Sequence, residues 1–205
     1  IVVKAELLAF VVSMLAITAS HAGHGLMNSF ADVEWLPDPG VTPDQIAYLF
    51  DRIDESTELQ FAGSPDEKIA LCLEFAREKL AETSAMIKDH EGDAASFAMR
   101  LYGDYLARVS AIVEGADPSR AAGRRHRFIN ALLEHVYIMS VDYLDMPLEI
   151  RTRLSPLFAT AMRHYEAHSA RLPKGEKEAF FFKEEEIRWS LEMTQQADKQ
   201  RITNW

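Results

Sequence analysis

Hydrophobic residues along most of the chain recur every three or four positions, the spacing that places them on one side of an α-helix. Proline-containing caps mark where several of these stretches begin, because proline is favoured in the first helical turn. The predicted helices start at Thr42-Pro43, Ser64-Pro65, Asp93, Asp117-Pro118, Ser155-Pro156 and near Lys177. The second to sixth are predicted to end at Gly92, Gly115, Met146-Pro147, near Arg171 and near Lys199. Short connections favour antiparallel neighbours, so the pattern predicts an all-α, antiparallel helical bundle of about six helices.

An apolar run, LLAFVVSMLAITA, occupies residues 7–19 and precedes Ser20-His21-Ala22, a small-x-small pattern that signal peptidases cleave. A helix of this length covers roughly 20 Å, short of the ~30 Å hydrocarbon core, which favours a cleaved signal peptide. Counted from Ile1 to Ala19, the segment could instead cross the inner membrane at a tilt as a signal anchor, with Lys4 reaching the interface. Residues 1–22 therefore predict a hydrophobic N-terminal helix and an extracytoplasmic, periplasmic location for the rest.

The remaining chain divides into three predicted segments. Residues 23–41, GHGLMNSFADVEWLPDPGV, carry several glycines and prolines without a helical period, which predicts a linker or an extended arm. Residues 42–172 are predicted to form the helical bundle, and residues 173–205 to form a C-terminal interaction helix.

Composition limits the possible functions. The 205 residues allow one domain of ordinary size, and 48% hydrophobic with 26% charged residues is typical of a folded globular protein. A net charge of −10 argues against nucleic-acid binding, which needs a basic surface. The single cysteine, Cys72, lies between Leu71 and Leu73 in a helical pattern and is predicted to be a core residue.

Several segments in order resemble a known family. These are Thr-Pro-Asp at residues 42–44, SPDEKIALCLEFAREKLAE, ALLEHVYIM, DMPLEIRTRL and AMRHYEAH. Over residues 38–171 they resemble a family of exported bacterial and archaeal helical domains of unknown function. The chain departs from that family at Gln45-Ile46-Ala47-Tyr48, where the family has a further proline and an aromatic pair. The resemblance implies a helical fold and export, and it implies no chemistry.

Histidines offer the candidate metal ligands. His164 and His168 are four residues apart on one helix, so they face the same side, and His135 or His126 could supply a third ligand. His21 and His24 near the predicted cleavage site could chelate copper if His21 became the free N-terminus. The alternative is that these histidines are structural or solvated, and no cofactor is predicted.

The basic residues cluster at the start of the fourth predicted helix, where the helix dipole disfavours cations. They are Arg120, Arg124, Arg125, His126 and Arg127. We expect Arg124, Arg125 and Arg127 to pair with carboxylates of the fold, or to contact anionic lipid or an acidic partner.

The last predicted helix carries two apolar stripes. At about 100° per residue, Ile187 and Leu191 lie close to Phe180, whereas Phe182, Trp189 and Met193 lie on the opposite side and Phe181 lies among acids. One stripe can pack on the bundle, so the second is predicted to contact the N-terminal arm, a partner or a second copy.

The sequence contains no catalytic motif, so we expect a protein that is not an enzyme. The function predicted is a non-catalytic accessory or structural subunit of a membrane-associated complex, bound to a membrane protein complex or to itself through the C-terminal helix. The alternative is a small periplasmic copper- or zinc-binding, or stress-sensing, helical protein.

Overall fold

The computed structural model describes residue 30 and residues 33–203. Every regular element in this part of the chain is a helix, which confirms the predicted all-α bundle of six long helices. The long helices are α2 (Tyr48–Phe61), α3 (Pro65–Lys88), α4 (Gly92–Glu114), α5 (Pro118–Asp145), α6 (Leu148–Ser169) and α8 (Phe181–Thr203). A short helix α7 (Lys174–Lys177) and a 3-10 turn η1 (Glu178–Phe180) lead into α8.

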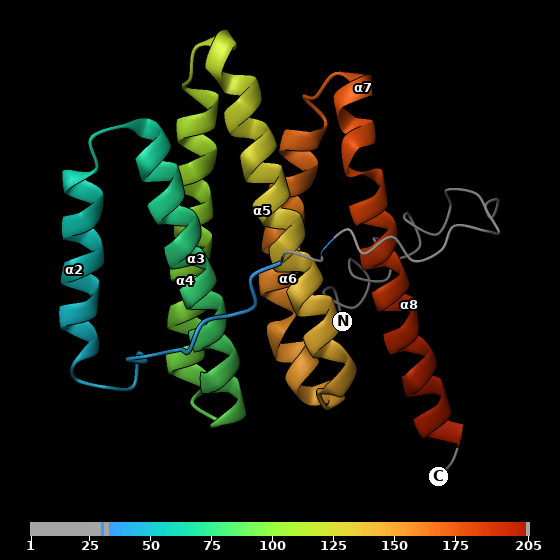
Figure 1. The fold of residues 1–205 in the computed structure, drawn as a ribbon. Coiled ribbons are helices and arrows are strands. Elements are labelled where there is room, and N and C mark those ends of the chain that lie inside the picture. Colours follow the sequence, from blue (N-terminus) through green and yellow to red (C-terminus); the bar gives the residue numbers. More distant parts are fainter. Residues whose placement is uncertain (1–29, 31–32, 204–205) are drawn as a thin grey trace.

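The long helices lie side by side and alternate in direction (Figure 1). Helix α2 forms one edge of the molecule and packs on α3, and α8 forms the other edge and packs on α5. Between the two edges, α3 and α5 lie in front of α4 and α6 in the view of Figure 1. The hydrophobic core lies among these four central helices, where Tyr102, Phe128 and Leu157 are buried. Cys72 is also buried, which confirms its predicted core position.

The first helix begins later than predicted. Thr42, Asp44 and Gln45 bond to one another through their side chains, and the Gln45 N–H donates to the Thr42 carbonyl at 2.9 Å. These residues close turns ahead of α2, which begins at Tyr48. The predicted start at Thr42-Pro43 was wrong because the capping residues satisfy one another locally.

The fifth helix begins earlier than predicted. Helix α6 starts at Leu148, directly after Pro147, and Pro156 lies inside it. Proline has no N–H to donate to the Thr152 carbonyl, and the Ser155 hydroxyl donates to that carbonyl instead, at 2.8 Å. The prediction that Ser155-Pro156 starts a helix was wrong because a neighbouring side chain replaces the missing bond.

The joint between α3 and α4 also differs from the prediction. Helix α3 ends at Lys88, and His90 has the left-handed backbone conformation, with φ of 65°. Gly92, predicted to end the second helix, is the first residue of α4, and Asp93 lies in the first turn. The predicted boundary at Gly115 is confirmed, since α4 ends at Glu114.

The described part of the predicted linker lies along the bundle as an arm. The Phe30 ring stacks on Tyr137 of α5 with 4.0 Å between centroids, and Glu34 pairs with Arg77 of α3 at 2.5 Å. The predicted N-terminal helix and its cleavage site lie outside the described residues. Among the described helices, none is long and apolar enough to cross a membrane.

Candidate docking helix and its polar network

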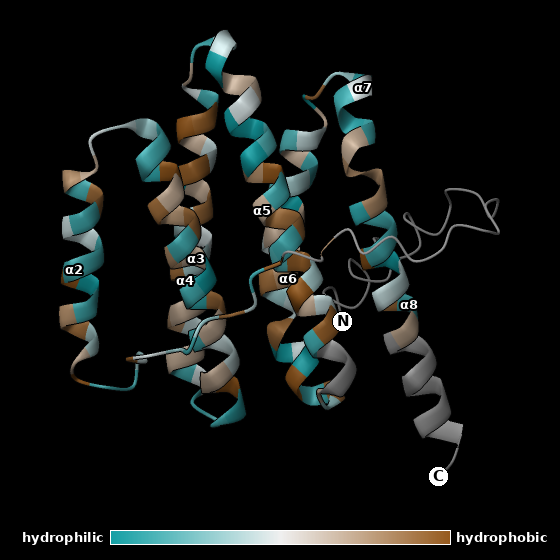
Figure 2. Ribbon diagram, viewed as in Figure 1, coloured by the Kyte–Doolittle hydropathy of each residue, from teal (hydrophilic) through white to brown (hydrophobic). Residues whose placement is uncertain are grey.

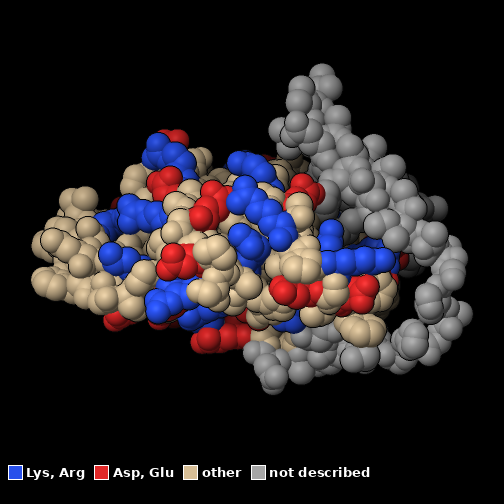
Figure 3. Space-filling model, turned by 90° about the horizontal axis from the view of Figure 1, so that it is seen from above, with Lys and Arg blue, Asp and Glu red and all other residues tan. Residues whose placement is uncertain are grey.

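Helix α2 presents large hydrophobic side chains to solvent. Their exposed fractions are Leu49 69%, Phe50 69%, Ile53 59% and Phe61 79%, and Ile46 in the turn just before the helix is 89% exposed. Seen from above, the outermost edge of the molecule, where α2 lies, shows only uncharged side chains (Figure 3). Hydrophobic and hydrophilic residues alternate along this edge helix in Figure 2.

Helical geometry explains this distribution. At about 100° per residue, Leu49, Phe50 and Ile53 fall within an arc of roughly 100° on the outer side of α2. Tyr48 and Glu55, the two buried residues of α2, lie on the opposite side. The helix is therefore inverted relative to an ordinary surface helix, which buries its apolar stripe and exposes its charges.

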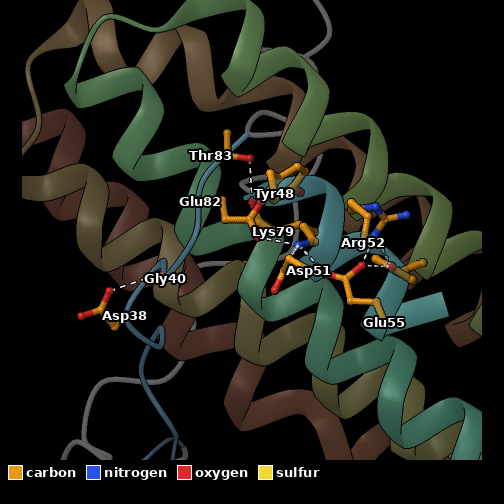
Figure 4. A network of polar contacts seen from close by, with 10 residues as sticks. Asp38, Gly40, Tyr48, Asp51, Arg52, Glu55, Lys79, Glu82 and Thr83 are labelled. Atoms are coloured by element: carbon orange, nitrogen blue, oxygen red, sulfur yellow. Dashed lines mark hydrogen bonds and ion pairs between the residues drawn. The ribbon is translucent and has the colours of Figure 1, made fainter. Parts of the chain in front are cut away.

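The inner side of α2 is held by a buried lysine of α3 (Figure 4). The Lys79 ammonium is fully buried and lies 2.5 Å from one oxygen of Glu55 and 2.5 Å from one of Glu82. The Glu55 oxygen accepts no hydrogen bond, so its contact with Lys79 is an ion pair without hydrogen-bond geometry. Asp51 lies farther from the ammonium, at 3.6 Å. Tyr48 donates to Glu82 at 2.8 Å and completes the connection between α2 and α3.

A second cluster of polar contacts joins α2 to α4. Arg52 and the Tyr105 hydroxyl both donate to the same Glu55 oxygen, and Arg52 also contacts that hydroxyl. The Arg52 guanidinium lies over the Tyr105 ring, 5.6 Å from its centroid. Glu55 thus receives groups from three helices, α2, α3 and α4.

The polar network between α2 and its neighbouring helices is largely shielded from water and contains more carboxylates than cations. Two cations, Lys79 and Arg52, face the three carboxylates of Asp51, Glu55 and Glu82. Burial raises the pKa of Glu82 above its usual value, although Lys79 and Tyr48 oppose that rise. The arrangement can orient α2 on the bundle, because each bond depends on direction and distance.

The second predicted surface, on α8, has the two stripes expected from the sequence. Phe180 and Ile187 are buried, which confirms the inner stripe. The outer residues Phe182, Trp189 and Met193 are exposed, and Phe181 beside them is exposed too. The described part of the N-terminal arm lies on α5, where Phe30 meets Tyr137 and the Lys183 ammonium, 4.9 Å from the ring centroid.

The basic cluster on α5 divides into paired and exposed members. Arg124 is buried and donates two hydrogen bonds, of 2.7 and 2.8 Å, to Asp66 in the first turn of α3. Arg124 also holds the pKa of Asp66 below its usual value. This confirms the expected pairing for Arg124, whereas Arg125 is half-buried and Arg127 is exposed.

The predicted metal ligands are not brought together within the described residues. His168 is buried, and its Nε2 lies 2.8 Å from the Ser110 hydroxyl. His164 is half-buried nearby, but His135 bonds to Tyr102 and His126 packs on Phe180. No group of three potential ligands occurs in the described part of the chain, and His21 and His24 lie outside it. Metal binding stays a prediction.

Sequence reasoning missed the inverted orientation of α2. The hydrophobic spacing of Leu49, Phe50 and Ile53 identifies a helix, but not the side of that helix that meets the bundle. Lys79 carried the available signal, because it lies on the same helical side as the buried Cys72 and Ala76. A lysine among core positions indicates carboxylate partners on a neighbouring element.

The comparison with protein families matches residues 40–135 to a domain of unknown function (DUF5667). The match supports the family resemblance over these residues and begins just before α2. It includes the whole polar network and ends within α5, so α6 and α8 lie beyond it. No curated protein and no solved structure matches the chain.

Proposed function

We propose that this chain is a non-catalytic docking protein, an accessory subunit that binds its partner through the outer face of α2. The observation that carries the proposal is the inversion of α2, with the carboxylate of Glu55 buried on the inner side and large hydrophobic residues exposed on the outer side. Exposed contiguous hydrophobic surface in a folded protein marks sites of association.

The polar network supports this role. A helix held on a bundle by apolar packing would have to bury Leu49, Phe50 and Ile53 to stay in place. Here Glu55 and Tyr48 fix α2 through ion pairs and hydrogen bonds, so its hydrophobic residues are available to a partner. A rigid, pre-positioned helix also loses less conformational entropy on binding than a flexible segment does.

The test is photo-crosslinking in the cell from a benzoylphenylalanine placed at Ile53. We expect an adduct from this position and none from the same probe at Lys174, an exposed residue at the start of α7. Phe50→Ser should weaken the adduct at position 53 while leaving the unfolding free energy within about 0.5 kcal/mol, because Phe50 is exposed. Absence of any adduct at position 53 would refute the proposed function.

The cellular location is part of the same proposal. The apolar run at residues 7–19, followed by the body, supports delivery of the chain to the extracytoplasmic side of the inner membrane. A reporter enzyme that folds only after export, fused after Trp205, should be active. If instead a reporter that works only in the cytoplasm is active when fused at the same place, this location is contradicted.

The outer stripe of α8 offers a second surface. Trp189 and Met193 are exposed beside Phe182, and tryptophan with large apolar neighbours is a frequent centre of interfaces. The metal-binding alternative is tested by calorimetric titration of Cu²⁺ and Zn²⁺ into the protein. A dissociation constant above ~10 μM for both ions would contradict this alternative.

A further inference from the structure

A surface groove lies between α4 and α6. It has a volume of about 720 Å³ and is open to solvent. Phe97, Leu101 and Leu157 provide its apolar lining. Gly103 of α4 lies near Thr160 of α6, with 3.8 Å from its Cβ position to the threonine methyl, so the two helices approach closely at the groove.

The edges of the groove carry positive charge. Arg100 and Arg163 line it, against the single carboxylate of Asp104. Within the described residues neither guanidinium makes an ion pair, and Arg100 lies over the Phe97 ring, 5.2 Å from its centroid. The groove therefore combines an apolar floor with unpaired cations on its rim.

Helix α2 has the complementary surface. Its outer hydrophobic residues are flanked on one side by Asp54 and Glu58, which are exposed and, being four residues apart, point the same way. From Leu49 to Glu58 the helix is about 14 Å long, and the stretch of α4 along the groove, from Phe97 to Ala107, is about 15 Å. The two surfaces match in polarity, charge and length.

We infer that the groove between α4 and α6 binds α2 of a second copy of this chain, with Asp54 and Glu58 of one copy facing Arg100 and Arg163 of the other. This inference deepens the proposed function, because it names the occupant of the α2 surface. An amphipathic helix in an apolar groove is a common mode of recognition, and charged rims fix its orientation.

Two other occupants of the α2 face fit the charges less well. Antiparallel pairing of α2 with α2 of a second copy, about a two-fold axis, would bring the Asp54 and Glu58 flanks of both helices together. Like charges in that position oppose association. An anionic membrane surface would likewise repel these carboxylates.

The inferred contact joins two different surfaces, so it is heterologous, and a pair of copies keeps one free groove on one copy and one free α2 on the other. We expect the average mass of the full chain in mild detergent to rise with concentration in sedimentation experiments. A chain that stays monomeric at every concentration would overturn the inference.

Complementation between two variants is the sharpest test. Phe50→Ser with Ile53→Ser disables α2 but leaves the groove intact, and Arg100→Glu with Arg163→Glu disables the groove but leaves α2 intact. Each variant alone should be monomeric, whereas an equal mixture should form 1:1 dimers that grow no further. A mixture that stays monomeric would overturn the inference, because no other pairing of these surfaces predicts this behaviour.

Charge exchange tests the orientation. Asp54→Lys with Glu58→Lys should weaken association at least about 10-fold, and combining it with Arg100→Glu and Arg163→Glu should restore it to within about 3-fold. Arg127→Glu reverses an exposed arginine outside the groove and should leave association unchanged. Failure of the combined variant to recover would overturn the assigned contacts.

The crosslinking experiment separates failure of this inference from failure of the proposed function. An adduct at position 53 that contains a second copy of this chain supports the inference. An adduct with a different protein overturns the inference and leaves α2 as the docking surface. No adduct removes both.

Discussion

Replacement of Lys79 by methionine should strongly destabilise the fold, beginning at α2. Methionine fills a similar volume but leaves the buried carboxylates of Glu55 and Glu82 without their shared cation. Breaking a buried ion pair by removing one partner costs about 3–5 kcal/mol, because the remaining charge stays desolvated. That is a large part of the ~5–15 kcal/mol that stabilises a typical domain.

Urea denaturation followed by circular dichroism at 222 nm measures this loss, and Lys68→Met provides the control. Lys68 is an exposed residue of the same helix, so its replacement should change the free energy of unfolding by less than about 0.5 kcal/mol. Hydrogen exchange should show the fastest new opening in α2, since Lys79 holds α2 on α3.

If the destabilisation comes from unpaired buried charge, two further results are expected. Adding Glu55→Leu and Glu82→Gln to Lys79→Met should recover much of the lost stability, because no unpaired buried charge remains. The Lys79→Met penalty should also shrink as the pH falls from 7 to 5. Burial already raises the pKa of Glu82, and loss of Lys79 raises it further, so the folded variant takes up a proton more readily than the unfolded chain.

A Lys79→Met penalty below about 1 kcal/mol would refute the reasoning, because it would mean that Glu55 and Glu82 are solvated or protonated without cost. A triple variant no more stable than Lys79→Met would refute it as well.

Other positions give independent predictions. Burial lowers the pKa of His135 to about 4, so between pH 6.5 and 4 the folded chain binds fewer protons there than the unfolded chain. The free energy of unfolding should therefore fall as the pH is lowered through this range. Urea denaturation at pH 7 and at pH 5 should show that His135→Gln loses roughly 2 kcal/mol less than the unmodified chain between these two pH values. Asp66→Asn should destabilise the fold chiefly because the buried Arg124 loses its charged partner. In a double-mutant cycle, Asp66→Asn combined with Arg124→Met should therefore lower the free energy of unfolding by less than the sum of the two single changes. Trp189→Ala with Met193→Ala should leave the melting temperature within a few degrees because both side chains are exposed, and a loss of several kcal/mol would show that they are internal core.

The sequence determined the helices and the inner side of most of them. Helical spacing with proline caps located the six long helices, because those signals act between residues close along the chain. The same spacing correctly divided η1 and α8 into a stripe containing Phe180 and Ile187, which are buried, and one containing Trp189, which is exposed. The family resemblance found in the sequence is supported over residues 40–135.

The starts of two helices needed the structure, because local bonds competed with the expected caps. Thr42 and Gln45 bond to each other and delay α2, and the Ser155 hydroxyl takes over the bond that Pro156 cannot make inside α6. Both outcomes depend on which of several short-range hydrogen bonds forms, and sequence patterns do not distinguish among them.

Tertiary structure alone decided which side of α2 meets the bundle. Leu49, Phe50 and Ile53 have the spacing of a buried stripe, and by themselves they predict an inward orientation. That orientation is reversed because Lys79, twenty-four residues beyond Glu55 in the sequence, is buried where Glu55 of α2 joins Glu82 of α3 as its partner. The groove between α4 and α6 is equally a product of packing, since its apolar floor and its two arginines come from helices separated by the whole of α5.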